Sequence, residues 1–142
     1  MDDEYNLHRF IEAQEPVYDD AIRDLRRGRM CLGHVDFIFP RLAAGRNTPG
    51  PYAITSLDEA GAYLSFPILG GRYRECVGAL QRLPDLSARA VFGEAGARRL
   101  HASLTLFSEA SDEFLFETMF YAWFDSRLDG DTANVLRSRA RG

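Results

Sequence analysis

Apolar residues in this chain recur at intervals of three and four, in short runs that glycine and proline interrupt. One such run contains Val17, Ala21, Ile22 and Leu25, and Gly28 comes soon after it. Residues at this spacing share one face of a helix, and glycine is favoured just beyond a helix C-terminus. The spacing therefore predicts short helices and restricts the chain to an all-α fold.

Capping residues indicate where further helices begin. Ser56-Leu57-Asp58-Glu59 is a capping box, in which serine and glutamate side chains satisfy the first free backbone N–H groups. Further helix starts are predicted at Ser87, at Ser111, and at Asp131 or Thr132. Gly93 is expected to end the helix that begins at Ser87, and residues 30–42 fit a short strand or a helical turn equally. The pattern predicts six to eight short helices with at most a trace of β.

The chain has 142 residues, the usual size of one domain, and 46% of them are hydrophobic. Folding a chain of this length buries roughly 70% of the surface of the unfolded chain, so the core needs no disulfide. We expect residues 1–142 to form a single compact domain, with residues 1–5 and 138–142 as frayed tails. Residues 43–51 are rich in glycine and proline and are predicted to form a loop.

All 17 basic residues are arginine, which excludes any chemistry that needs a lysine amine. Schiff-base enzymes, pyridoxal-phosphate enzymes and P-loop proteins are therefore ruled out. Arginine cannot replace lysine in these roles, because its guanidinium group keeps its proton in proteins. The net charge of −4 also argues against general nucleic-acid binding, which usually requires a basic face. No cofactor is expected.

Cys31 and Cys76 do not form the disulfide pattern of a secreted protein, and we interpret both as reduced thiols. The acidic start of the chain is unlike a signal peptide. The most apolar run, residues 114–124, is too short to cross a bilayer. The sequence therefore predicts a cytoplasmic protein without a membrane partner.

An ordered series of short motifs runs from Leu7 to Leu136. It includes Leu7-x-Arg9-Phe10-x-Glu12-Ala13-Gln14, Phe37-Ile38-Phe39-Pro40, Ala62-Tyr63-Leu64-x-x-Pro67-x-Leu69-Gly70 and Ser103-x-Thr105-Leu106-Phe107. Each motif is weak alone, but their order is specific, and the series resembles the domain of unknown function 1810 family. That family is small, predominantly helical and without an established activity. The resemblance therefore implies a helical fold and no particular reaction.

The chain departs from the pattern of this family where the pattern is most aromatic. Family members typically read His-Trp-Met-Trp before the Phe-Ile-Phe-Pro motif and glutamine after it. Here these positions hold Gly33-His34-Val35-Asp36 and Arg41. Phe66 stands where histidine is usual, and Arg99 stands where lysine is usual. The chain thus resembles a divergent member that has lost the aromatic cluster, the obvious candidate for a ligand surface in the family.

Three potential metal ligands lie close together in the sequence at Cys31, His34 and Asp36. A zinc site needs a further ligand, and no second Cys/His pair follows. His34 and Asp36 would also suit a general base, but the sequence places no serine or cysteine as their partner. We therefore assign no metal ligand and no catalytic residue, and we expect a buried Cys31 beside a solvated His–Asp pair. One function that stays open is therefore an enzyme built around His34 and Asp36.

Arginine, hydroxyl and tyrosine side chains provide the candidate ligand-binding set. Its members are Tyr18, Arg29, Arg72, Arg74, Ser103 and Thr105. Guanidinium groups bind carboxylate or phosphate through two hydrogen bonds, so a pocket lined by this set would hold a small anionic or nucleotide-like ligand. The alternative is that the arginines form internal ion pairs and the other side chains pack in the core.

Residues 114–124 form a helical run that is apolar on nearly every side. Such a helix is buried all round, which is difficult in a chain of this size. It is therefore predicted to be either a central core helix or an interface with a second copy of the chain. The predicted interface residues are Phe116, Phe120, Tyr121, Trp123 and Phe124.

No group of residues in the sequence forms a convincing catalytic constellation. The sequence therefore favours a non-enzymatic binding or protein-interaction module, with a homodimer as one expectation. The alternative is a protein that binds or processes a small anionic or nucleotide-like ligand. Whether the chain catalyses a reaction is left open by the residues alone.

Overall fold

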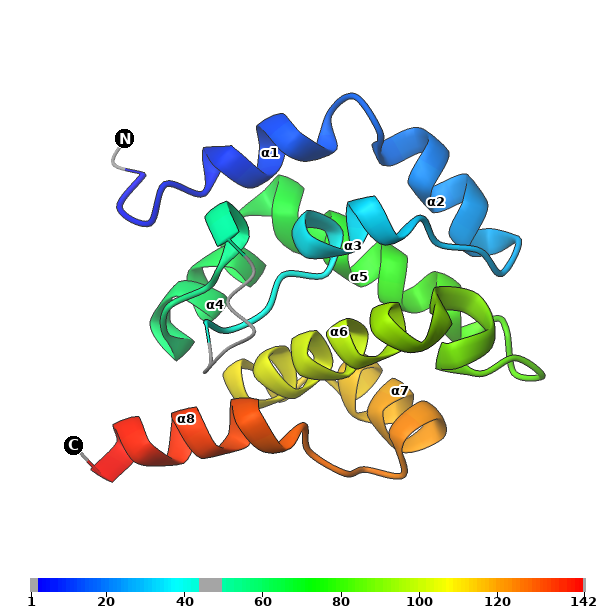
Figure 1. The fold of residues 1–142 in the computed structure, drawn as a ribbon. Coiled ribbons are helices and arrows are strands. Elements are labelled where there is room, and N and C mark those ends of the chain that lie inside the picture. Colours follow the sequence, from blue (N-terminus) through cyan, green and yellow to red (C-terminus); the bar gives the residue numbers. More distant parts are fainter. Residues whose placement is uncertain (1–2, 44–49, 142) are drawn as a thin grey trace.

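The structure, a computed structural model, describes residues 3–43 and 50–141 of the chain. Within these residues it contains eight α-helices and one short 3-10 helix, and no strand (Figure 1). The helices are α1 (His8–Gln14), α2 (Tyr18–Arg26), α3 (Leu32–Ile38), α4 (Leu57–Ser65), α5 (Pro67–Gln81), α6 (Ala88–Ala110), α7 (Phe114–Phe124) and α8 (Gly130–Arg141), and the 3-10 helix is η1 (Gly50–Tyr52). An isolated parallel bridge joins Leu42 to Ile54. The prediction of a single all-α domain with a trace of β is confirmed.

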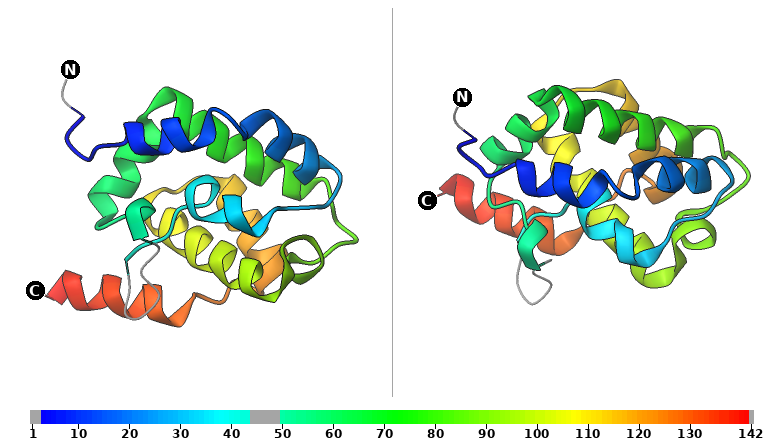
Figure 2. Two further views of the ribbon diagram at one scale, coloured as in Figure 1. Left: turned by 45° about the horizontal axis from the view of Figure 1, so that its top comes forward. Right: turned by 90° about the horizontal axis from the view of Figure 1, so that it is seen from above.

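Helices α5 and α6 form the centre of the fold. α5 packs against α1, α2, α4 and α7, while α6 packs against α3, α4, α7 and α8. The ribbon views show α1 and α2 along one side of the molecule and α8 along the opposite side (Figures 1 and 2). The two central helices therefore connect elements from both ends of the chain.

Aromatic rings fill the space between these helices. The ring centroid of Tyr73 on α5 lies 4.4 Å from that of Phe107, 5.4 Å from that of Phe116 and 5.8 Å from that of Phe39. Tyr63 on α4 also contacts Phe107, with the ring centroids 5.4 Å apart, and all five side chains are buried. Aromatic pairs of this kind add about 0.5–1.5 kcal/mol beyond the area they bury. This cluster holds α4, α5, α6 and α7 on one core.

Several helix ends lie where the capping residues predict them. Ser56 and Ser87 each accept a hydrogen bond from the backbone N–H three residues later, at 3.0 and 3.1 Å. Gly28 follows α2 with a φ of +79°, a conformation that favours glycine. Gly93 has a non-helical φ of +74° and ends the first helical part of α6, as predicted, and a second helical part follows this kink.

Other elements decide between alternatives or correct a prediction. Residues 30–42, which fitted a short strand or a helical turn equally, contain the helix α3. Ser111 does not cap α7, because its hydroxyl is hydrogen bonded to the N–H and carboxylate of Glu113, and the helix begins at Phe114. α8 begins at Gly130, and the carboxylate of Asp129 accepts hydrogen bonds from the N–H and hydroxyl of Thr132 at 3.1 and 2.7 Å.

The two ends of the chain are held by polar contacts in the part that the structure describes. The carboxylate of Asp3 accepts hydrogen bonds from the N–H groups of Leu7 and His8 at 2.6 and 3.0 Å, at the start of α1. Arg139 on α8 donates to the carbonyl of Thr55. Residues 1, 2 and 142 of the predicted tails, and residues 44–49 of the predicted loop, lie outside the described residues. Among the described helices, none combines the length and the apolar character that a membrane span requires.

Candidate functional site

The structure brings Tyr18 and Arg72 of the candidate ligand-binding set together where α1 and α2 meet α5. The guanidinium carbon of Arg72 lies 4.8 Å from the ring centroid of Tyr18, in a cation–π contact. Its Nη1 donates to Gln14 Oε1 at 3.3 Å, and its Nη2 donates to Glu15 Oε1 at 3.2 Å. Gln14 is itself buried, and its Nε2 donates to the hydroxyl of Tyr63 at 3.0 Å. Arg72 is thus engaged by neighbouring side chains of the same chain.

The hydroxyl of Tyr18 is also used internally. It donates to the carboxylate of Glu75, which accepts a further hydrogen bond from Arg26 at 3.4 Å. Burial raises the pKa of Tyr18, and the nearby Cys76 and Glu75 raise it further. Burial raises the pKa of the Cys76 thiol to about 12, so this thiol is neutral at physiological pH and is a poor nucleophile. The contacts join α2 to α5 and offer no activated group.

The two other arginines of the set lie elsewhere. Arg74 donates from Nε and Nη2 to the two carboxylate oxygens of Glu113 at 2.6 and 2.9 Å, and from Nη1 to the carbonyl of Leu64 at 3.1 Å. These hydrogen bonds raise the pKa of Arg74 and lower that of Glu113. Arg29 is exposed on the loop between α2 and α3. Arg74 therefore connects α5 to the start of α7, and Arg29 faces solvent.

Ser103 and Thr105 are buried on α6. The hydroxyls of Ser103 and Tyr73 lie 2.9 Å apart within the aromatic core. The hydroxyl of Thr105 donates to the carbonyl of His101 at 2.8 Å and accepts the N–H of Asp129 at 3.0 Å. Five of the six candidate residues thus make internal contacts, Arg29 is exposed, and the described contacts join only Tyr18 and Arg72 to each other.

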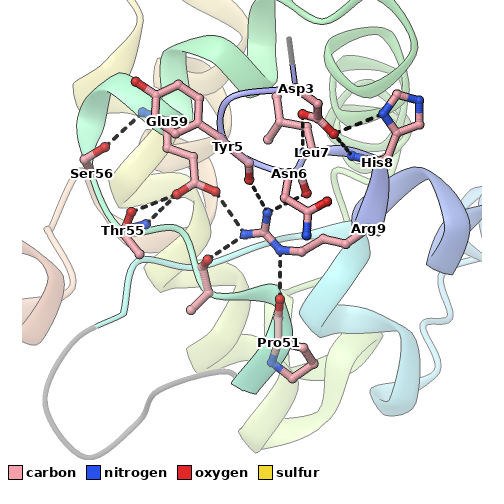
Figure 3. Close-up of polar contacts among 11 residues, drawn as sticks. Asp3, Tyr5, Asn6, Leu7, His8, Arg9, Pro51, Thr55, Ser56 and Glu59 are labelled. Atoms are coloured by element: carbon pink, nitrogen blue, oxygen red, sulfur yellow. Dashed lines mark hydrogen bonds and ion pairs between the residues drawn. The ribbon is translucent and has the colours of Figure 1, made fainter.

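The densest polar cluster surrounds Arg9, a residue outside the candidate set predicted from the sequence (Figure 3). Its guanidinium donates to the carbonyls of Tyr5, Asn6, Pro51 and Ala53 and to the carboxylate of Glu59, at distances of 2.6–2.9 Å. All five N–H groups of Arg9 are used. The other carboxylate oxygen of Glu59 accepts the N–H and hydroxyl of Thr55 at 3.0 and 2.9 Å. This cluster joins segments of the protein to each other, and the guanidinium of Arg9 has no N–H group left to donate to a ligand.

The predicted interface residues on α7 divide into three groups. Phe116 and Phe120 are buried in the core of their own chain, which corrects the expectation that they face a partner. Trp123 and Phe124 are half-buried, and Phe124 stacks on the imidazole of His101 with ring centroids 4.3 Å apart. Tyr121 is 72% exposed. α7 is therefore a core helix along one side and open along the other.

The outer side of α7 also carries an aromatic residue that the sequence analysis did not select. Phe114 is 78% exposed, and it precedes Tyr121 by seven residues. Residues seven apart lie nearly above one another on a helix, because two turns contain about 7.2 residues. This spacing was visible in the sequence, but the apolar pattern does not show which side of α7 is covered.

Cys31, His34 and Asp36 do not converge on a metal-binding arrangement. Cys31 is exposed rather than buried as expected, and the ring of His34 lies against Phe37 with centroids 5.7 Å apart. Asp36 instead forms an ion pair with Arg41, with Nη2 and Oδ1 2.9 Å apart. Within the described residues no group of three or more His, Cys, Asp or Glu side chains is placed to hold a metal ion.

Comparisons with known proteins give a family and no activity. The family described as protein of unknown function (DUF1810) matches residues 4–136. The crystal structure of the conserved hypothetical protein Rv1873 from Mycobacterium tuberculosis is 34% identical to this chain and superposes with a TM-score of 0.90, covering 95% of this chain and 99% of that one. A comparison with curated proteins gives no match. The resemblance read from the ordered motifs is therefore confirmed, and the chain belongs to the DUF1810 family.

Proposed function

We propose that the chain is a non-enzymatic interaction module that pairs with a second copy of itself through the outer face of α7. The observation that carries this proposal is the exposure of Phe114 and Tyr121, at 78% and 72%, on one side of the helix. Exposed large apolar side chains on one face of a helix offer a surface for protein contact. By contrast, Tyr18 and Arg72 of the candidate ligand set are already engaged by internal partners.

The spacing of the two rings suits a two-fold contact. If two copies of α7 pack antiparallel, each Phe114 lies against Tyr121 of the other copy, as the self-complementary surface of a two-fold dimer requires. Glu117 and Thr118 then lie between the two ring pairs, near the symmetry axis. Glu117 is exposed, so the two like charges approach each other and weaken the dimer.

The exposed area sets the strength of the contact. Four aromatic side chains that each bury about 150 Å² would remove roughly 600 Å² from water. Stable interfaces bury about 1,200–2,000 Å² in total, so the dimer is weak and depends on concentration. We expect a dissociation constant of about 0.1–1 mM.

The proposal places this module in the cytoplasm. Cys31 and Cys76 are both free, and Cys31 is exposed. Exposed free thiols are typical of a reducing compartment, where they are protected from uncontrolled oxidation. Fluorescence microscopy of the tagged chain in its source cells tests this placement, and an extracytoplasmic signal would overturn it.

Sedimentation velocity from about 10 µM to 1 mM tests self-association over the expected range. The parent chain should shift from monomer towards dimer, and the double variant Phe114→Ser/Tyr121→Ser should remain monomeric. The control variant Leu57→Ser/Leu86→Ser changes two other exposed apolar residues and should associate like the parent. Glu117→Gln should tighten the dimer, because it removes the like charges at its centre. A parent chain that stays monomeric, or a double variant that associates like the parent, would overturn the proposal.

A further inference from the structure

A cluster of three charged side chains lies between α3 and α6, on elements that the α7 contact does not use. Asp36 belongs to α3, Arg41 follows that helix, and Arg99 lies on α6. Nη2 of Arg41 is 2.9 Å from Asp36 Oδ1, and Nη1 of Arg99 is 3.5 Å from the same oxygen. We propose that Arg41 and Arg99 bind the oxyanion group of a small ligand, a carboxylate or a phosphoryl group, in competition with Asp36.

The first support is the pairing of two guanidinium groups with one carboxylate oxygen. Nη2 of Arg41 and Nη1 of Arg99 both approach Asp36 Oδ1. Burial lowers the pKa of Arg41, the charges of Asp36 and Asp129 oppose this shift, and the charge of Arg99 adds to it. A ligand oxyanion in the place of the Asp36 carboxylate would meet the same two guanidinium groups.

The second support is an unused donor. Nε of Arg41 is buried and has no hydrogen-bond partner within the described structure. Asp36 accepts from Nη2 of the same guanidinium and does not reach this nitrogen. A buried N–H without an acceptor is unfavourable, and the planar guanidinium presents its donors as a fork that matches two oxygens of a carboxylate or phosphate. A ligand oxyanion can thus satisfy a donor that Asp36 leaves unpaired.

The third support is access from solvent. The side chain of Arg41 is only 12% exposed, whereas those of Asp36 and Arg99 are 31% and 32% exposed. A ligand can therefore approach Arg41 from the side on which Asp36 and Arg99 lie. A rotation of the Asp36 side chain towards solvent would release both guanidinium groups.

This arrangement makes Asp36 an internal competitor of the ligand. A carboxylate of the chain that bridges two arginines mimics the group that these arginines would bind. Removing its charge should therefore strengthen binding, and removing Arg99 should weaken it. These opposite effects separate a binding site from a purely structural ion pair, in which both changes would only lower stability.

Isothermal titration calorimetry of the full chain with acetate and with inorganic phosphate, at constant ionic strength set by chloride, tests the inference. We expect saturable binding in about the millimolar range for one of these two ions, and the ion that binds identifies carboxylate or phosphoryl as the preferred group. Asp36→Asn should tighten that binding about tenfold, because one charge-assisted hydrogen bond no longer competes. Arg99→Gln should weaken it about tenfold.

Two control variants test whether the changes in binding are specific to Arg99 and Asp36. Arg98→Gln removes the same charge from the neighbouring residue of α6, which is 72% exposed and pairs with Glu94, and it should bind like the parent. Asp20→Asn removes an exposed carboxylate on α2 and should not tighten binding. The inference is overturned if neither ion binds to the parent or to Asp36→Asn, or if Arg99→Gln and Arg98→Gln bind alike. If Asp36→Asn does not fold, the comparison of Arg99→Gln with Arg98→Gln still tests the inference.

Discussion

Arg9 Nη2 donates to Glu59 Oε2 at 2.9 Å, although the two residues are 50 positions apart in the sequence. The side chain of Glu59 is only 4% exposed, and the other donors of Arg9 meet backbone carbonyls before α1 and before α4 (Figure 3). One guanidinium therefore fixes two separate segments to each other and also neutralises a buried carboxylate. A planar group with five donors is required for this arrangement.

Arg9→Lys should lower the free energy of unfolding by about 2 kcal/mol, because lysine keeps the charge but offers three donors instead of five, and each lost hydrogen bond is worth about 1 kcal/mol. Urea denaturation followed by circular dichroism measures this loss. Arg23→Lys is the control, since Arg23 forms an exposed pair with Asp20 at 3.0 Å and should change stability by less than about 0.5 kcal/mol. Equal losses in the two variants would contradict the role of Arg9.

Local signals in the sequence predicted the helices well because a cap acts over only three residues. The hydroxyls of Ser56 and Ser87 bind the N–H groups that the sequence pattern indicates. The prediction failed at Ser111, where a long-range contact intervenes: Glu113 pairs with Arg74, which is 39 residues away. A cap can be identified from its neighbours, but a competing partner from another helix cannot.

The candidate site was harder to predict because its contacts join distant segments. Tyr18 and Arg72 meet across 54 residues, and no spacing within one helix indicates this contact. Asp36, Arg41 and Arg99 were each identified as positions that differ from the family pattern, and the structure shows that all three belong to one ion cluster. The sequence shows that these three positions depart from the family pattern, but only the fold shows that their side chains contact one another.

Gly70→Ala and Gly71→Ala should have opposite effects, although the two glycines are neighbours on α5. An ideal Cβ at Gly70 would lie 2.0 Å from the carbonyl oxygen of Leu64, whereas one at Gly71 would meet nothing within 4 Å. Gly70→Ala must therefore separate α4 from α5 and should cost at least about 2 kcal/mol. Gly71→Ala should stabilise the protein by up to about 1 kcal/mol, because alanine restricts the unfolded chain.

Thermal unfolding followed by circular dichroism compares these two variants directly, since both add the same methyl group to the same helix. The melting temperature should fall for Gly70→Ala and should stay level or rise for Gly71→Ala. Equal melting temperatures would contradict the close approach of the α4 carbonyl to α5.

Glu113→Gln should destabilise the protein at neutral pH and progressively less so in acid. The hydrogen bonds from Arg74 lower the pKa of Glu113 in the folded state. A lowered pKa means that the stabilisation is present above the unfolded-state pKa and is lost as the pH falls through the folded-state value. Urea denaturation between about pH 7 and pH 3 should therefore show the two proteins converging below about pH 4. Glu109→Gln, an exposed change of the same charge, should show no such convergence.

The two cysteines should react with a thiol reagent at very different rates. Cys31 is exposed, whereas Cys76 is buried with its Sγ 3.9 Å from the hydroxyl of Tyr18 and with its pKa raised to about 12 by burial. Only a thiolate reacts, so at about pH 8 the native protein should release a single equivalent of chromophore from a disulfide reagent, and a second only on denaturation. Cys31→Ser should abolish the fast equivalent and Cys76→Ser should preserve it. A fast reaction at Cys76 would mean that α2 separates readily from α5, because the thiol can be reached only when that contact opens.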